Sequence, residues 1–211
     1  DEQQACKDGY IYVHDKNRRL ICTNCCLFDV KTVLEHGVVM SGVEYTQPKY
    51  LSTVCGVFKD IVMTAGSQQY GGITVQSVDE ILAPYVKRSF EYHYDKIRHL
   101  AKRVSKGGRI DYVEVRKQAM EETQRELEQG IQAMEIAYNT LPSSRGDFVF
   151  VTYTFGLQED KWGKMVSQTI MDVRRGGQGA DGKKVPVLFP KLVFLFDHGK
   201  HGKGKPSRDL F

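Results

Sequence analysis

The sequence predicts an α/β fold, in which apolar strands alternate with amphipathic helices. Two segments rich in β-branched and aromatic residues, FVFVTYTF at 148–155 and VLFPKLVFLF at 187–196, are apolar enough to be strands buried on both faces. Residues 161–173 lie between them with the spacing of a helix. A helix that connects two such strands favours a parallel sheet, whose binding sites lie at the carboxyl ends of the strands.

An earlier strand is predicted to end in a cluster of cysteines. The apolar run that starts at Tyr10 reaches Cys22, Cys25 and Cys26, and residues 27–36 then have helical spacing up to the stop at Gly37. Thr23 and Asn24 directly precede Cys25, so their polar side chains would line whatever cavity the strand faces. A metal site, a redox pair, a working thiol and simple packing all have to be weighed at this position.

The spacing of the cysteines separates these alternatives only in part. Cys22 and Cys25 supply two zinc ligands, but no second CxxC or HxxxH accompanies them, and Cys6 and His14 are the only nearby additions. A thioredoxin-like pair would occupy this strand-to-helix position, but Cys26 and the order of the upstream elements count against it. The pattern leaves a cleft-lining thiol, from Cys25 or Cys26, and simple burial as equal alternatives.

Three more helices are expected, two of them long. Pro48 opens one helix, which buries Cys55 and stops at Gly66, and the polar segment 67–72 that follows predicts a turn at its double glycine. A capping box of Ser77 and Glu80 begins a long helix, and a second long helix runs from about 110 to 138. Together they predict an antiparallel hairpin with a mixed surface, which is typical of a subunit contact.

Composition narrows the class of protein. The 211 residues carry a formal charge of +4, with basic and acidic residues interspersed, which favours a solvated surface over nucleic-acid binding. No apolar run approaches the roughly 20 residues of a membrane span, and five cysteines without a regular framework favour reduced thiols in a cytoplasm. The chain opens without Met and closes on a glycine- and lysine-rich loop, so we expect a fragment.

Six motifs, in order along the chain, resemble those of the anaerobic (class III) ribonucleoside-triphosphate reductases, which are glycyl radical enzymes. The motifs are YIYVHD at 10–15, TNCCLFDV at 23–30, SQQYGG at 67–72, LAPYVKR at 82–88, FVFVTYTFG at 148–156 and FPKLV at 189–193. The resemblance covers nearly all 211 residues. It implies the first half of a ten-stranded α/β barrel, as one partial catalytic domain. Within this domain, 1–76 hold the first strand and helices, 77–139 the dimer and effector hairpin, and 140–211 further barrel strands.

The resemblance also implies a chemistry. In the family an iron–sulfur activase that uses S-adenosylmethionine makes a radical on a C-terminal glycine, the radical passes to a loop cysteine, and this thiyl takes the ribose 3′ hydrogen. A cysteine on the first barrel strand helps to expel the 2′ hydroxyl as water, with formate as the usual reductant. That cysteine carries over onto Cys25, whereas Cys26 would point away from the cavity because neighbours on a strand face opposite ways.

Further roles carry over from the same resemblance. Asn24, Ser143, Ser144 and Gly146 are expected near the ribonucleoside triphosphate, and Lys49 is expected to meet the phosphate of a deoxynucleotide effector at a helix N-terminus. No metal or cofactor is expected within these residues, since the family's radical glycine, thiyl cysteine and four-cysteine zinc site would belong to a missing C-terminal half. The chain departs from the family at Tyr12, where a second histidine is common.

Two hypotheses therefore remain. The first is an inactive part of a dimeric, cytoplasmic reductase, and the second is a nucleotide-binding or dimerising module that has the same fold without catalysis. A relative of pyruvate formate-lyase is disfavoured, because that family carries two adjacent cysteines on a finger loop rather than on an early strand. A companion chain with the glycine motif would restore activity under the first hypothesis only.

Overall fold

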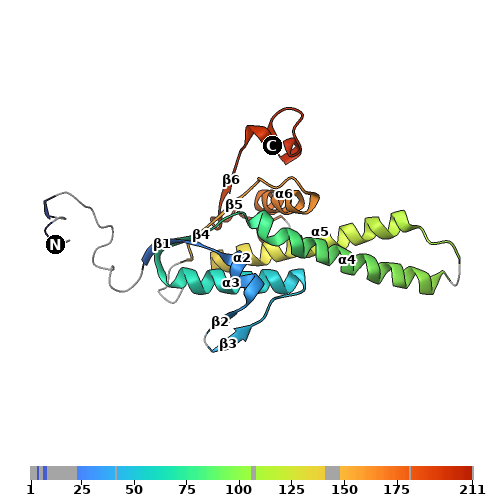
Figure 1. The fold of residues 1–211 in the computed structure, drawn as a ribbon, viewed down its shortest axis with the longest axis horizontal. Helices are drawn as coiled ribbons and strands as arrows, with labels where there is room; N and C mark the ends of the chain where they lie inside the picture. The colour runs from blue at the N-terminus through green and yellow to red at the C-terminus, as the bar shows by residue number, and fades with distance from the viewer. Residues whose placement is uncertain are drawn as a thin grey trace.

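The chain folds around one parallel sheet. The computed structural model describes residues 4, 7–8, 23–40, 42–105, 108–140, 148–180 and 182–210. Four strands pair in the order β1-β4-β5-β6, every neighbouring pair parallel. Their bounds are β1 Thr23–Phe28, β4 Gln69–Val75, β5 Val151–Phe155 and β6 Lys191–Phe194 (Figure 1). The prediction of an α/β fold with a parallel sheet is confirmed.

Helices connect the strands and account for most of the described chain. Between β1 and β4 lie α2 Val30–His36, the small hairpin of β2 Val38–Met40 and β3 Val43–Tyr45, and α3 Leu51–Ser67. The two long helices, α4 Val78–Val104 and α5 Tyr112–Thr140, connect β4 to β5 and pack along each other (Figure 1). After β5 come α6 Lys161–Gly176, β6, and the short α7 His198–His201 and η2 Arg208–Leu210.

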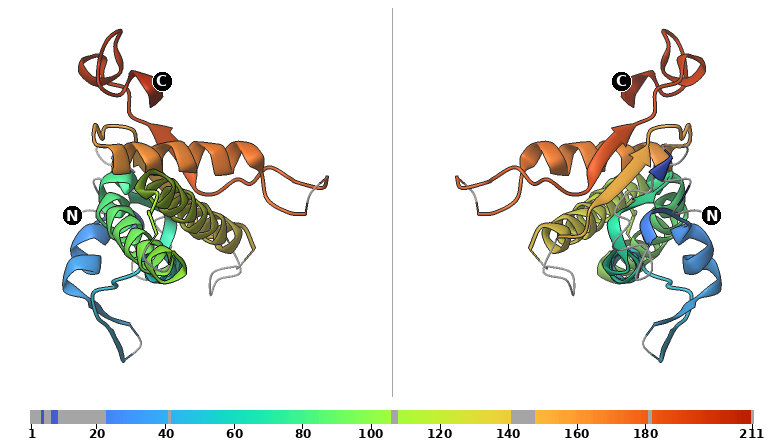
Figure 2. Two further views of the ribbon diagram at one scale, coloured as in Figure 1. Left: turned by 90° about the vertical axis from the view of Figure 1, so that its right-hand side faces the viewer. Right: turned by 90° about the vertical axis from the view of Figure 1, so that its left-hand side faces the viewer.

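All the large helices lie against one face of the sheet. On β4 and β5 every second residue is buried, namely Ile73, Val75, Val151, Tyr153 and Phe155, and these residues share one cluster with α3, α4, α5 and α6. The strands follow one another across the sheet in chain order, and right-handed crossovers in one direction place the connecting helices on one side. In the right-hand view of Figure 2, strands β5 and β6 pass in front of the helices. One face is therefore core and the other has no helix over it among the described residues.

Aromatic residues fill the centre of this core. The rings of Phe58 and Tyr153 meet edge to face with centroids 5.7 Å apart, and the hydroxyls of Tyr138 and Tyr153 share a hydrogen bond of 2.7 Å. Burial raises the pKa of both tyrosines, so both hydroxyls stay protonated. Cys55 packs nearby against Gly130 with 3% of its surface exposed, and burial followed by the charge of Glu126 raises the pKa of its thiol to about 12. The prediction that Cys55 lies on the buried face of its helix is confirmed.

A buried carboxylate ties the start of α4 to the next strand. Asp79, with 1% of its surface exposed, accepts hydrogen bonds from Gly156 N–H at 2.8 Å and from the Ser167 hydroxyl at 3.0 Å. His201 holds the C-terminal segment to the same turn: Asp197 N–H donates to Nδ1 at 3.0 Å, so Nε2–H donates to the Gly156 carbonyl at 2.7 Å. These bonds fix the carboxyl end of β5.

The sequence patterns misplaced several boundaries. The segment 67–72, predicted as a turn, begins strand β4, where its glycines run beside β1. Pro48 precedes its helix, which begins at Leu51 after the cap residue Tyr50. The predicted capping box is absent: the N–H of Ser77 donates to the Thr154 hydroxyl at 3.0 Å, which holds this residue in a left-handed conformation (φ 50°), and the N–H of Glu80 donates to Asp79 instead.

The late strands are buried on one face only. Burial alternates along Val151–Phe155, and Phe148 and Phe150 just before it are 48% and 45% exposed. Along β6, Lys191 is exposed and Val193 is 42% exposed. The prediction of strands buried on both faces was wrong, because no layer of the described chain covers the second face.

Candidate functional site

The two adjacent cysteines of β1 lie on opposite faces of the sheet. Partners in register across parallel strands point the same way, and Cys26 is in register with the core residue Ile73. Cys25 is in register with Gly72, and Leu27 with Thr74, on the uncovered face. Cys26 packs half-buried against the core, whereas Cys25 is exposed. The alternation expected for this pair is what the strand shows.

We call the uncovered side of the sheet the open face. It consists of the residues that share the orientation of Cys25 in the strand register: Cys25, Leu27, Gly72, Thr74, Thr152, Thr154, Lys191 and Val193. Three threonine hydroxyls, one lysine and one thiol give this side the polar character that the core side lacks. Leu27 is nevertheless 69% exposed, so an apolar side chain is part of the same surface. An open face of this composition can contact a polar ligand or a further layer of protein.

An irregularity in strand pairing brings Asn24 and Cys25 to the same place. Two steps along β1, from Thr23 to Cys25, correspond to three steps along β4, from Gln69 to Gly72. Bulges of this kind redirect side chains locally. Both the Asn24 amide oxygen and the Cys25 sulfur lie beside Gly71, within 2.6 Å of the position that a Cβ would take there. The amide predicted to contact substrate is thus a neighbour of the predicted catalytic thiol.

The two thiols have different surroundings. Burial, followed by the negative charge that Cys25 would carry as a thiolate, raises the pKa of the Cys26 thiol. The residues around Cys25 do not give it a dry apolar setting in the described chain: Leu27 is turned to solvent and Phe28 packs on the core side. Leu20 and Ile21, which precede the cysteines in the sequence, lie outside the described residues. Any shelter for Cys25 has to come from beyond the described chain.

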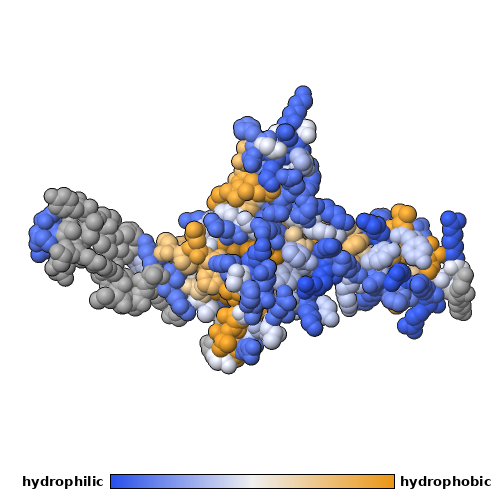
Figure 3. Space-filling model, in the orientation of Figure 1, coloured by the Kyte–Doolittle hydropathy of each residue, from blue (hydrophilic) through white to orange (hydrophobic). Residues whose placement is uncertain are grey.

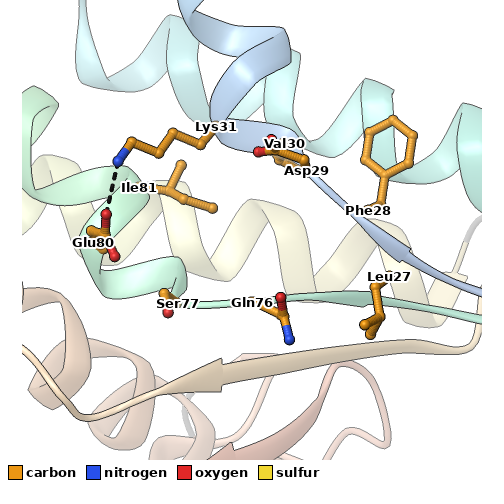
Figure 4. A pocket seen from close by; sticks show the side chains of 9 residues that line it. All are labelled: Leu27, Phe28, Asp29, Val30, Lys31, Gln76, Ser77, Glu80 and Ile81. Atoms are coloured by element: carbon orange, nitrogen blue, oxygen red, sulfur yellow. Dashed lines mark hydrogen bonds and ion pairs between the residues drawn. The ribbon is translucent and has the colours of Figure 1, made fainter.

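A cavity of about 190 Å³ opens where β1 and β4 end. Leu27 and Phe28 reach its rim from opposite sides of β1, and Lys31 of α2 donates to Glu80 of α4 at 2.7 Å (Figure 4). Asp29 is engaged as the cap of α2, since its carboxylate accepts from the N–H and hydroxyl of Thr32. In this cavity Lys31 and Glu80 are therefore paired with each other, and Asp29 is engaged within its own helix.

A larger cavity, of about 470 Å³, lies between the start of α3 and the two long helices, and Lys49 lines it. At its base the Glu126 carboxylate accepts from Ser52 N–H at 3.1 Å, from the Ser89 hydroxyl, and from His93 Nε2 at 3.2 Å. Burial acts to raise the pKa of this carboxyl, but the hydrogen bonds outweigh it and lower the pKa. Glu126 is thus a fixed negative charge at the N-terminus of α3.

Several predicted residues fall outside the described chain. Ser143, Ser144 and Gly146 lie in the undescribed segment 141–147, and the zinc alternatives Cys22, Cys6 and His14 lie before residue 23. Among the described residues no three His, Cys, Asp or Glu side chains gather to hold a metal. No helix in that part of the chain is long and apolar enough to cross a membrane.

Sequence reasoning missed the two groups that define the sites. Gly71 was assigned to a turn, although a glycine inside a strand also indicates a close approach by another group. Glu126 was one of many acids on a long helix. Its position four residues before the small Gly130, on the face that meets α3, is a signal that helical spacing could have supplied.

Comparison with known proteins matches the whole chain to one family. A family model described as anaerobic ribonucleoside-triphosphate reductase matches residues 1–209. The anaerobic ribonucleoside-triphosphate reductase of Enterobacteria phage T4 is 34% identical over 210 residues, which cover 98% of this chain and 33% of that protein. The enzyme of the same name from Escherichia coli (strain K12) is 33% identical over 213 residues, which cover 100% of this chain and 28% of that protein. The chain thus spans about a third of the length of these curated relatives.

A solved structure shares the fold. The anaerobic ribonucleotide reductase from Thermotoga maritima, in complex with dATP and CTP, superposes with a TM-score of 0.52 at 17% identity, covering 79% of this chain and 27% of that one. A second structure of that enzyme, with dATP in its specificity site, gives a TM-score of 0.51. Together with the family match, these findings confirm the resemblance seen in the motifs, and the chain belongs to the family of anaerobic ribonucleoside-triphosphate reductases.

Proposed function

We propose that this chain forms part of the active site of an anaerobic ribonucleoside-triphosphate reductase and that Cys25 is its catalytic thiol. The observation that carries the proposal is the orientation of Cys25, which projects from the open face while Cys26 packs on the core side. A thiol turned away from the helices is free to meet a substrate, and a thiol under the helices is not.

The arrangement of strands supports a place for this face inside a barrel. Four parallel strands follow in chain order with every large helix on one side. Continued in the same direction, such a sheet curls into a barrel whose helices lie outside and whose open face lines the interior. The four strands are then the first part of a ten-stranded barrel of the glycyl-radical type, and the paired long helices are its hairpin.

The chemistry assigned to Cys25 is proton delivery to a ribose. A glycyl radical on another part of the complete enzyme initiates the removal of a hydrogen atom from the substrate. Within this chain, the Cys25 thiol donates its proton to the 2′ hydroxyl, which leaves as water. The Asn24 amide beside it orients the ribose through a hydrogen bond. We assign the remaining contacts with the ribonucleoside triphosphate to Ser143, Ser144 and Gly146.

The exposure of Cys25 indicates what the complete enzyme has to add. A proton donor of this kind works best where water is excluded and competing reactions are suppressed. The remaining two thirds of the relatives' length provide the cover, together with the radical glycine and the zinc site. An iron–sulfur activase makes the radical, and formate is the reductant.

Reconstitution tests the proposed function. The chain alone, with activase under anaerobic conditions, is expected to give no deoxynucleotide. A chimera in which it replaces the matching third of a complete anaerobic reductase is expected to convert CTP to dCTP. A folded chimera that binds nucleotide but stays inactive would instead identify a non-catalytic module of the same fold.

The second cavity supports a role in effector binding. Lys49 lies at its rim, where the lysine ammonium can meet a phosphate, and the cavity is large enough for a nucleoside. The T. maritima enzyme has dATP in its specificity site. We assign Lys49 to the phosphate of a deoxynucleotide, and the paired helices α4 and α5 to the contact between two subunits.

Binding of dATP to the chimera tests this assignment. Lys49→Ala is expected to weaken binding about tenfold, the equivalent of one charge-assisted hydrogen bond of about 1.5 kcal/mol. Lys59→Ala within α3, whose ammonium pairs with Asp60 at 3.3 Å outside the cavity, is the matched control. Equal affinities in the two variants would remove Lys49 from the effector site.

A further inference from the structure

The two glycines of β4 have different neighbours. A Cβ added at Gly71 would lie 2.6 Å from the Cys25 sulfur, 2.5 Å from the Asn24 amide oxygen and 2.9 Å from the Asn24 carbonyl oxygen. A Cβ added at Gly72 would instead meet β5, 2.5 Å from the carbonyl oxygen of Phe150. Both distances to β1 side-chain atoms are shorter than real Cβ contacts. Gly71 alone therefore faces the thiol and the amide.

The need for glycine at position 71 arises from space rather than from backbone conformation. Gly71 does not have the positive φ found at Gly37 or Gly156, so an L side chain would be conformationally allowed. The extra residue of β4 at the irregular pairing places Gly71 beside Asn24 and Cys25 of β1. A missing Cβ at such a point lets another group approach the backbone closely.

From this geometry we infer that Gly71 is a positioning residue, which leaves room for the Cys25 thiol and the Asn24 amide beside β4. This inference rests on the proposed function of Cys25 for its consequence in catalysis, but its geometry does not. A methyl group at position 71 has to push the sulfur toward another rotamer, and the thiol then leaves the place where it meets the ribose. Gly71 acts through Cys25 and touches no reacting atom itself.

The geometry is tested first by coupling between positions 71 and 25. The free energy of unfolding is measured for Gly71→Ala and Gly72→Ala, each alone and combined with Cys25→Ala. Removal of the sulfur is expected to relieve part of the loss in stability caused by Gly71→Ala, the remainder coming from the Asn24 carbonyl oxygen. The loss caused by Gly72→Ala is expected to be the same with and without the sulfur.

The test still gives an answer if the Gly71→Ala variant does not fold. Should Gly71→Ala fail to fold, recovery of a folded protein on adding Cys25→Ala supports the inference, and failure of both to fold overturns it. Equal losses with and without the sulfur also overturn it.

Thiol reactivity provides a readout that a purely structural role would not change. The rates of alkylation of Cys25 and Cys26 by iodoacetamide are followed by peptide mass spectrometry. Gly71→Ala is expected to change the ratio of the two rates several-fold, and Gly72→Ala to leave it as in the unmodified chain. An unchanged ratio in Gly71→Ala would contradict a displaced thiol.

The catalytic consequence is measured in the active chimera. Gly71→Ala is expected to lower kcat about 100-fold with little change in KM, as for a reacting group displaced by about 1 Å. If coupling and altered reactivity are found but Cys25→Ala keeps full activity, then the positioning by Gly71 stands and the proposed function of Cys25 fails. If Cys25→Ala is inactive while Gly71→Ala keeps its kcat, then the proposed function of Cys25 stands and the positioning by Gly71 fails.

Discussion

The two faces of the sheet differ in burial and in the polarity of their side chains. On the core side, Val151, Tyr153 and Phe155 are at most 2% exposed and pack under four helices. On the open face, the intervening Thr152 and Thr154 have hydroxyls and no helix above them in the described chain. The comparison teaches that one strand sequence serves two purposes: alternate residues pack in the core, and the residues between them face the uncovered side, where Thr154 also accepts a hydrogen bond from Ser77 N–H.

The adjacent cysteines are the sharpest form of this comparison, and they give the largest expected effect. In the active chimera, Cys25→Ala is expected to lower turnover by about 10²–10⁴-fold, the contribution typical of a positioned proton donor. Cys26→Ala is expected to keep turnover and to lose on the order of 1 kcal/mol of stability through packing. Anaerobic turnover and urea unfolding measure the two quantities. The opposite pattern would show that the catalytic cysteine had been assigned to the wrong face.

Neighbouring residues of β5 extend the comparison to stability. Val151→Ala removes two buried methyl groups beneath the helices and is expected to lower the free energy of unfolding by about 2 kcal/mol. Thr152→Ala, one residue away on the open face, is expected to change it by less than about 0.5 kcal/mol. Urea denaturation of both variants decides the matter, and equal losses would mean that something covers the second face as well.

The paired tyrosine hydroxyls test the core side alone. Tyr153→Phe leaves the buried Tyr138 hydroxyl without its partner and is expected to cost about 1–3 kcal/mol. Converting both tyrosines to Phe is expected to cost less than the sum of the two single changes, because no orphaned hydroxyl remains. Thermal or urea unfolding of the three variants gives the coupling, and strictly additive losses would argue against this hydrogen bond.

In the cavity that Lys49 lines, Glu126 is expected to make a pH-dependent contribution to stability. The pKa of Glu126 is lowered in the folded chain from its ordinary value of 4.5, so its hydrogen bonds stabilise the fold above pH 4.5 and are lost as the pH falls through the lowered value. Glu126→Gln is therefore expected to flatten the decline of stability in this acidic range and to leave its pH dependence near neutrality unchanged. Melting temperatures from pH 3 to pH 7 test this, with Glu122→Gln as control, because Glu122 lies on the same helix with its side chain 44% exposed.

A surface ion pair should give the smallest effect. Lys31 and Glu80 join α2 to α4 at 2.7 Å, but both side chains are nearly half exposed. Lys31→Ala is expected to lower the free energy of unfolding by less than about 1 kcal/mol and to respond to salt. A larger loss in urea titrations would mean that the cavity between α2 and α4 depends on this pair.

Local sequence patterns were enough for the helices, for the α/β class and for the opposite orientations of Cys25 and Cys26, because each follows from a period of 3.6 or 2 residues. They were not enough for β4. Its segment QYGGITV begins with the residues that ordinarily mark a turn, and only pairing with β1 shows that Gly71 leaves space for a sulfur. Local propensity also proposed a cap at Ser77, which the distant Thr154 overrides.

The small hairpin of β2 and β3 escaped prediction for a related reason. Its strands of three residues each are too short for a clear alternation, and Val39 and Val43 stay 67% and 58% exposed. Figure 3 shows apolar surface on this hairpin below the body of the molecule. Lys49 illustrates a different limit: helix spacing placed it near an N-terminus, but only the packing of α3 against α4 and α5 reveals the cavity beside it.

The outer strands have a practical consequence. In the described chain β1 and β6 each pair with a single neighbour, so each offers one row of unmatched peptide groups along its length. Unpaired edge strands of this kind pair with other chains and promote aggregation. We therefore expect concentrated samples to self-associate, less so when a companion polypeptide supplies the next strands. In the proposed barrel, the same two edges are the places where the remaining strands would add.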